Sequence, residues 1–183
     1  KNTVGSATYT ALTNQNLSTA TIATSALTDL SSRSGDALNI TSTDKVTVSF
    51  TKGGKTYTSN YTVGTTKLSD LLASANTASG GTDVNTTMQA TSVIGTSPAN
   101  SKVYTADGKS AMTITANASG IDGQIAGFSI SITDKDGNVK KSANAALDAF
   151  NEAVRAQNSS EDNAITLQVG TKANQSIKVG LSD

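Results

Sequence analysis

Two runs of alternating polar and apolar residues, separated by a pair of glycines, constrain the fold more than any other feature of this sequence. Residues 46–50 and 57–63 both alternate, and both are rich in Val, Thr or Tyr. This period of two is typical of half-buried β-strands. Between the runs, Gly53 and Gly54 supply the positive φ that a tight hairpin turn needs. The stretch therefore predicts an antiparallel hairpin with one face in a core and a Thr- and Lys-covered face in solvent.

Helical spacing occurs in two places. After the hairpin, Thr65 or Thr66 provides a cap for a short helix with its leucines on one face. The longer pattern spans residues 141–157, KSANAALDAFNEAVRAQ. Its apolar residues fall at spacings of four, three and four, which is one stripe of a helix: Ala143, Leu147, Phe150 and Val154. We therefore expect two short helices packed on the strands.

Alternation or β-forming composition predicts further strands. These lie at residues 7–12, 88–94, 112–116, 128–132, 165–169 and 177–181, with a helical turn at 25–30. The last two strands form a closing hairpin, and Asp134–Asn138 forms a turn. The expected fold class is α+β, made mostly of antiparallel β-hairpins with two short packed helices.

The single proline, Pro98, is the best marker of a boundary, because the residue before proline is driven away from helix. It predicts two small lobes. Residues 1–98 form an outer variable lobe of strand, turn, strand and helix, and residues 99–183 form a second lobe that ends in the closing hairpin. An alternative places residues 38–100 as an insertion into a base built from the two flanking segments.

Composition excludes several classes of protein. The chain has 14 basic and 14 acidic residues, so it has no basic excess for phosphates or for an anionic membrane surface. No apolar run is long enough to span a bilayer. We therefore expect no nucleic-acid and no membrane partner. The absence of cysteine excludes a disulfide framework and a thiolate metal site, and it is compatible with a secreted bacterial surface protein.

The residue types also argue against catalysis. With no His and no Cys, the common pairs of nucleophile and base cannot be assembled. No spacing supports a Ser–Lys pair, and no apolar pocket pattern would raise the pKa of a carboxyl group. Gly120 and Gly123 lack the third glycine of a pyrophosphate loop. We expect that the protein is not an enzyme, with no catalytic residues, no cofactor-binding residues and no cofactor.

Asp134, Asp136 and Asn138 have the spacing that begins a calcium loop. Such a loop requires glycine at position six and glutamate at position twelve, where this chain has Val139 and Ala145. Asp, Gly and Asn are also common turn residues. We therefore expect a plain β-turn and no metal site.

The four tyrosines allow a different function. Tyr9, Tyr57, Tyr61 and Tyr104 could together form a platform on which sugars stack. Tyrosines in strands more commonly pack the ring and expose the hydroxyl, and we favour that interpretation. A carbohydrate-binding or adhesin-like module of a bacterial surface protein is nevertheless the alternative function.

Three segments resemble bacterial flagellins. Residues 167–183, LQVGTKANQSIKVGLSD, resemble the hairpin that lies beside the helical filament-core domain of that family. Residues 127–138 look like its variable outer region. The stretch 45–76, with its Gly-Lys-Thr-Tyr turn and leucine-rich helix, resembles a unit that recurs in flagellins and in filament-capping and hook-associated proteins.

The resemblance implies a structural component of the flagellar filament, extracellular and supporting motility. The long heptad-patterned helices through which flagellin copies associate are missing here, so the match is to the exposed outer domain. Because the sequence opens at Lys1 without Met, we expect an excised or processed part, and the alternative is a surface protein exported by a route that needs no cleavable signal. A hook- or cap-associated protein is an alternative, and glycans on exposed Ser or Thr are a further hypothesis.

Overall fold

The computed structural model describes residues 5–71, 73, 76, 79, 84–88 and 92–159. Within them the fold is α+β, mostly antiparallel β-sheet, as the alternating patterns predicted. The predicted closing hairpin of residues 165–181, and with it the segment that most resembles flagellin, lies outside the described residues.

Strands dominate the order of elements along the chain. The strands are β1 (Ala11–Asn14), β2 (Lys45–Lys52), β3 (Lys55–Thr62), β4 (Val84–Met88), β5 (Val93–Thr96), β6 (Lys102–Tyr104), β7 (Met112–Ala116), β8 (Ile125–Thr133) and β9 (Asn151–Val154). The helical elements are α2 (Lys141–Leu147) and the 3-10 turns η1 (Leu27–Asp29), η2 (Leu68–Asp70) and η3 (Ile121–Gly123).

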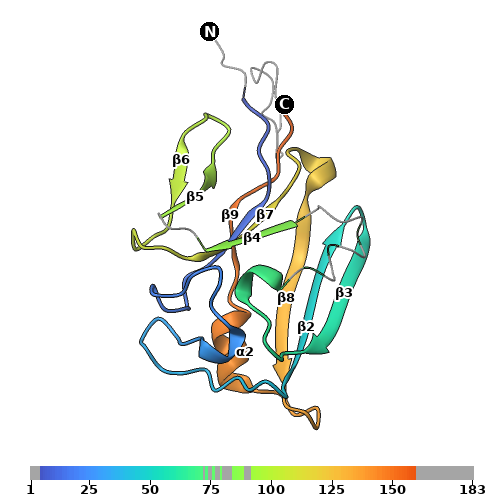
Figure 1. The fold of residues 1–183 in the computed structure, drawn as a ribbon. Helices are drawn as coiled ribbons and strands as arrows, with labels where there is room; N and C mark the ends of the chain where they lie inside the picture. Colours follow the sequence, from blue (N-terminus) through green and yellow to red (C-terminus); the bar gives the residue numbers. More distant parts are fainter. Residues whose placement is uncertain are drawn as a thin grey trace, which may run out of the picture.

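The strands form three antiparallel sheets. One has the order β4-β7-β1-β9, a second has the order β3-β2-β8, and the third is the hairpin β5-β6. The three-stranded sheet runs beside the four-stranded one, and α2 lies at the end of the body opposite the two described chain ends (Figure 1).

The hairpin of β2 and β3 is confirmed. Its two-residue turn places Gly53 at φ 59° and Gly54 at φ 79°, and Lys52 pairs with Lys55 across it. Positive φ at both turn residues is the geometry that matches the twist of a tight hairpin. Val48 and Phe50 of β2 are fully buried, so the alternating pattern identified the correct inner face.

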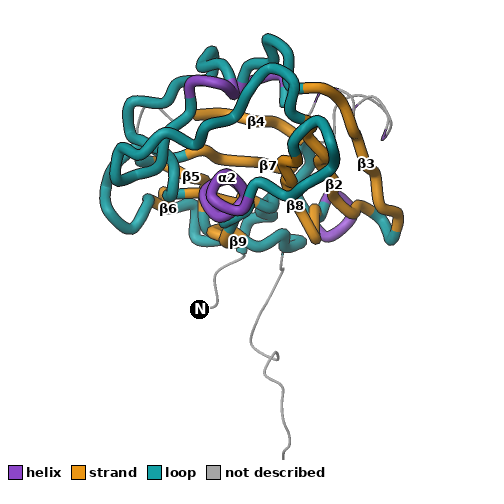
Figure 2. The backbone as a smooth tube through the Cα atoms, turned by 90° about the horizontal axis from the view of Figure 1, so that it is seen from below, coloured by secondary structure: helices purple, strands orange, loops and turns teal. Residues whose placement is uncertain are grey.

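A single large hydrophobic cluster fills the space between the two larger sheets. It takes side chains from every major region: Leu27, Leu68, Val46, Val48, Phe50, Met112, Ile114, Ile125, Ile130, Ile132, Ala143 and Leu147 are among its members. Figure 2 looks along α2, which lies in the middle of the body. The helix therefore closes the open end of this cluster.

The predicted helix over residues 141–157 is correct only in its first half. Helix α2 ends at Leu147, and residues 151–154 form β9, which pairs with β1. From Val154 to Gln157, apolar and polar residues alternate, so the pattern at this end of the segment fits a strand as well as a helix. Pairing with the free edge of β1 decided between them, which is a tertiary effect that local spacing does not contain.

Asn14 explains why the helix ends where it does. This buried side chain donates from Nδ2 to the carbonyl oxygens of Ala146 at 2.7 Å and Leu147 at 3.1 Å. The last carbonyls of a helix have no partner within the helix, so a buried donor there satisfies them. The end of β1 therefore caps the end of α2.

The predicted division at Pro98 into two lobes does not describe this part of the chain. β1, which precedes Pro98, pairs with β7 and β9, which follow it, and β2 pairs with β8. Both larger sheets therefore combine segments from the two sides of the boundary, and β2 also joins residues 38–100 to a flanking segment. Pro98 itself lies in the turn of the β5-β6 hairpin.

The expected helix after the hairpin is seen only in part. η2 places Leu68 fully in the core, as the leucine pattern predicted. Residues 73, 76 and 79 are helical, while the residues between them lie outside the described part of the chain. The helical turn predicted at 25–30 is η1, with Leu27 buried.

Candidate functional site

The most distinctive geometric feature is a stem made of residues 8–14 and 151–157, which run antiparallel. The backbone N–H of Thr8 donates to Gln157 O at 2.9 Å, and the N–H of Gln157 donates to Thr8 O at 3.2 Å. Further along, Ala11 pairs with Val154. The stem brings the two described ends of the chain together at one end of the molecule (Figure 1). No sequence motif revealed it, because its strands are about 140 residues apart.

The β5-β6 hairpin lies against the stem. The N–H of Ser6 donates to Pro98 O in the hairpin turn at 2.9 Å. Ile94 forms a small buried cluster with Ala11 and Val154, one from each stem strand. A Cβ atom on Gly95 would lie 3.0 Å from Val154 Cγ2. The backbone of β5 is therefore in close contact with the stem, and the β5-β6 hairpin packs against the side of the stem.

The loop with Gly120 and Gly123 contacts the stem from another direction. Gly120, at φ 86°, donates its N–H to Thr8 O at 2.8 Å. The N–H of Ile121 donates to Asn158 Oδ1 at 2.9 Å. These contacts occupy the backbone groups that a phosphate would need. The glycine pair is thus a structural loop.

A polar face made mostly of hydroxyl side chains, with Lys45 at one end, covers the outside of the three-stranded sheet. Three hydrogen bonds link neighbouring strands across it: Ser49 Oγ to Ser129 Oγ at 3.0 Å, Thr51 Oγ1 to Thr56 Oγ1 at 2.9 Å, and Asn60 Nδ2 to Thr47 Oγ1 at 2.8 Å. Cross-strand hydroxyl pairs of this kind support a sheet while leaving its outer face hydrated. We call this surface the hydroxyl face.

The segment from Asp134 to Asn138 is a tight turn, as predicted. Asp134 Oδ1 accepts the backbone N–H groups of Asp136 and Asn138, both at 2.9 Å, and Oδ2 accepts Asn138 Nδ2 at 3.0 Å. These hydrogen bonds, with that of the Asn138 side chain first, lower the pKa of Asp134 below its usual value. Its oxygens are committed to holding the turn.

The four tyrosines do not form one platform. Tyr57 and Tyr61 lie on the inner face of β3 and pack against the main core. Tyr9 also contacts the stem cluster, and Tyr104 is exposed on β6. Burial, followed by the nearby charge of Asp70, raises the pKa of Tyr61 to about 12. Its hydroxyl donates to Leu71 O at 2.9 Å, so this ring is part of the packing.

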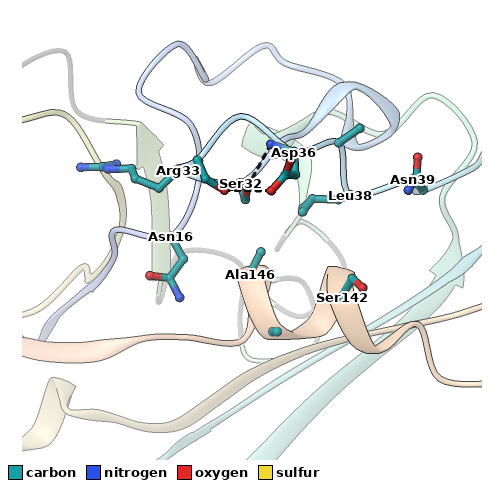
Figure 3. A pocket seen from close by; sticks show the side chains of 11 residues that line it. Asn16, Ser32, Arg33, Asp36, Leu38, Asn39, Ser142 and Ala146 are labelled. Atoms are coloured by element: carbon teal, nitrogen blue, oxygen red, sulfur yellow. Dashed lines mark hydrogen bonds between the residues drawn. The ribbon is translucent and has the colours of Figure 1, made fainter.

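A groove of about 600 Å³ lies between α2 and the loop of residues 32–39. Figure 3 shows Ser32 and Asp36 close together on this loop, with Asn39 apart from them and Arg33 extending to the opposite side. The Arg33 guanidinium binds Leu17 O and Ser110 O, both at 3.0 Å, and Asp107 Oδ2 at 2.6 Å. The Ser34 hydroxyl donates to Asp36. Arg33, the arginine that lines the groove, therefore links three loops and has a structural role.

One buried ion pair links the start of β2 to the start of α2. Lys140 Nζ lies 2.7 Å from Asp44 Oδ2, whose side chain is 3% exposed, and 2.6 Å from Asn39 O. Burial by itself raises the pKa of Asp44, but the hydrogen bonds from Lys140 and from the Thr41 backbone outweigh it and lower the pKa. The Asp44 carboxylate is therefore held in its charged form by its partners and is not poised for acid–base work.

Within the described ranges, no three acidic side chains gather at one place where they could hold a metal ion. The described helices include none that is long and apolar enough to cross a bilayer.

Comparison with known proteins gives a limited result. No family model and no curated protein matches the sequence. Among solved structures, the D1-D2-D3 domains of the flagellar cap protein FliD from Escherichia coli are similar with a TM-score of 0.43 and 17% identity, covering 85% of this chain and 39% of that one. The D2-D3 domains of the same protein give a TM-score of 0.43 and 15% identity, covering 85% and 66%.

The chain thus spans less than two thirds of the length of either cap-protein structure. At this identity and TM-score, the likeness is too low to assign a shared fold or activity.

Proposed function

We propose that this chain is the outer, solvent-facing domain of a flagellin-like filament subunit, and that it is a structural part which catalyses no reaction. The stem is the observation that carries the proposal. A domain held outside a filament must connect to the core through two chain segments that leave it side by side. The antiparallel pairing of Thr8 with Gln157 provides that arrangement.

The order of the sequence supports the same proposal. Residues 167–183, which resemble the flagellin hairpin beside the filament core, follow the second stem strand along the chain. The outer domain would then lie beyond that hairpin, joined to it by the stem. This is the order that an outer domain inserted into a core requires.

The contacts of the stem support a mechanical role. Asn14 fixes one end of the stem to α2, and Ser6, two residues before the other end, bonds to Pro98 of the β5-β6 hairpin. Because the stem is held on both sides, the body would move with it as one unit. The hydroxyl face would keep neighbouring copies hydrated and set the friction and the antigenic character of the surface.

Immunogold labelling of the source organism tests this proposal. Antibodies raised against the purified chain should decorate flagella along their length, because every filament subunit would carry the domain. Antibodies absorbed beforehand with the purified chain are the control, and they should leave the flagella bare.

The position of the gold particles separates the alternatives. Label confined to the filament tip would assign the chain to a cap protein, and label confined to the base would assign it to the hook. Label over the cell wall, with bare flagella, would contradict the proposal and favour an adhesin. In that case a glycan array, with and without Tyr104→Ala, would test sugar binding at the exposed tyrosine.

A further inference from the structure

The two edge strands of the three-stranded sheet differ in whether their outward backbone groups have hydrogen-bond partners. On β8, the outward N–H of Ile130 donates to Asp148 Oδ1 at 3.0 Å, and that of Ile132 donates to Asn144 Oδ1 at 2.6 Å. Ile132 O accepts the N–H of Lys140 at 3.0 Å. Side chains and backbone of the α2 region therefore close this edge, which is one way in which proteins prevent strands from adding to a sheet.

The other edge is β3. In a hairpin with a two-residue turn, the residues that flank the turn face each other through hydrogen bonds. The register Lys52–Lys55 therefore turns the odd-numbered residues of β3 toward β2. The backbone groups of four even-numbered residues point outward: Thr56, Thr58, Asn60 and Thr62. The described residues include no strand or side chain that pairs with them.

The β3 edge also lacks the charged residues and prolines that usually prevent another strand from pairing with a sheet edge. Residues 56–62 contain no proline and no charged side chain. Lys55 stands at the start of the strand, but its ammonium lies 5.2 Å from the centre of the Tyr57 ring. Exposed edges without charge, proline or a bulge are ready to pair with another strand.

A buried hydroxyl in the same strand points to a partner as well. The side chain of Ser59 is on the inner face of β3, and the residue is 6% exposed. Its Oγ has no hydrogen-bond partner among the described residues. A buried polar group without a partner costs free energy. A strand added beside β3 would place new groups next to it.

We propose that β3 pairs antiparallel with β3 of a second copy of this chain, with the two Ser59 residues opposite each other. In this register the inner-face neighbours across the junction are Tyr57 of one copy and Tyr61 of the other. On the outer face, Thr56 meets Thr62, and Thr58 meets Asn60. Aromatic pairs and hydroxyl pairs are favourable cross-strand neighbours, and each Ser59 hydroxyl gains a partner.

Charge distribution favours a second copy as the occupant. Each Lys55 lies opposite Val63 of the other copy, so the two lysines are at opposite ends of the junction. At about 3.4 Å per residue they are about 27 Å apart, which is well beyond the screening length at physiological salt. The chain has a formal net charge of zero, so the copies have no general repulsion to overcome.

Sedimentation velocity over a range of concentrations tests this proposal directly. The unmodified chain should show a reversible monomer–dimer equilibrium. Thr58→Lys places two like charges diagonally across the junction and should weaken the dimer by about tenfold or more. The matched control is Ser131→Lys, which adds the same charge on the same sheet face at β8 and should leave association unchanged. Circular dichroism verifies that both variants fold.

Two outcomes would overturn the proposal. One is a chain that stays monomeric at every concentration, and the other is an equal loss of association in both lysine variants, since that would reflect charge alone.

Disulfide trapping tests the register, because the chain has no native cysteine. Directly opposite residues have Cα atoms about 5.5 Å apart, within reach of a disulfide, whereas diagonal ones are farther apart. A mixture of Thr58→Cys and Asn60→Cys chains should therefore form the mixed dimer faster than either variant dimerises alone. Equal rates in the mixture and in the separate variants would exclude this register.

Discussion

The main body and the stem are stabilised in different ways. The body contains a continuous cluster of large side chains, in which Phe50, Met112 and Leu147 are at most 1% exposed. The stem cluster consists of Ala11, Ile94 and Val154, which bury little apolar area. Free energy from burial scales with that area. The body is thus held by side-chain packing, whereas the stem, apart from Leu12 in the main cluster, relies on backbone pairing and close contact.

Gly95 shows what the stem relies on instead. With no side chain, it allows β5 to approach so closely that an added Cβ would lie 3.0 Å from Val154 and 3.5 Å from Ala11. In the stem, the small residue Gly95 allows two backbones to approach closely, whereas in the body large side chains fill the core. This comparison teaches that substitutions which enlarge a side chain should harm the stem, and substitutions which shorten one should harm the body.

Phe50→Ala should produce the largest effect. The ring is fully buried in the main cluster and lies 5.6 Å from the Tyr57 ring, so its loss leaves a cavity. We expect the free energy of unfolding to fall by about 3–5 kcal/mol. Chemical denaturation monitored by circular dichroism measures it.

The control for this substitution is Ile22→Ala, at a residue that is 59% exposed, which should cost less than about 0.5 kcal/mol. A loss below about 1 kcal/mol for Phe50→Ala would show that the body is not held by this cluster.

The same comparison explains what the sequence could predict. The β2-β3 hairpin was predictable because its turn glycines and its alternation are local, and the turn at Asp134 was predictable for the same reason. The alternating pattern of β2 also predicted which of its side chains face the core, since Val46, Val48 and Phe50 are all buried.

The stem was not predictable, because its pairing joins residues 8 and 157 and no local signal marks either of them. The apolar stripe through Phe150 and Val154 predicted a helix, but pairing with the free edge of β1 selected a strand. The close contact at Gly95 is likewise a tertiary fact. The division at Pro98 failed because a proline that breaks a helix does equally well in a hairpin turn.

Gly95→Ala should produce an intermediate effect and should act on the stem. The added methyl group would press on Val154 Cγ2, and overpacking of this kind costs about 1–3 kcal/mol. Val154→Ala alone removes buried methyl groups and is also destabilising. In the double variant, however, the two changes compensate, because the space emptied at position 154 admits the new methyl group.

A double-mutant cycle of unfolding free energies measures this compensation. Strict additivity of the two changes in unfolding free energy would show that Gly95 and Val154 are not in contact. The close approach of β5 would then not contribute to the stability of the stem.

Lowering the pH should produce the smallest effect, and it should begin in the body, because the ion pair within the stem, Glu152 with Arg155, has an arginine side chain that is 81% exposed and contributes little. The pKa of Asp44 is lowered in the folded protein, since its hydrogen bonds with Lys140 and Thr41 outweigh the opposing effect of burial. Its contribution to stability is therefore complete above the ordinary pKa of aspartate and is lost as the pH falls through the lowered value. The unfolding free energy should decline with decreasing pH in that acidic range.

Lys140→Met removes the partner of Asp44 and should flatten this decline, and Asp44→Asn should do the same. The matched control is Lys135→Met, which breaks an ion pair whose side chains are 69% and 66% exposed and should have no measurable effect. Amide hydrogen exchange along the pH series locates the change. Protection should fall first around α2, whose start is tied to Asp44, while the amides of the stem strands keep theirs. If the stem amides lost protection first, the stem and not the body would contain the acid-sensitive contact.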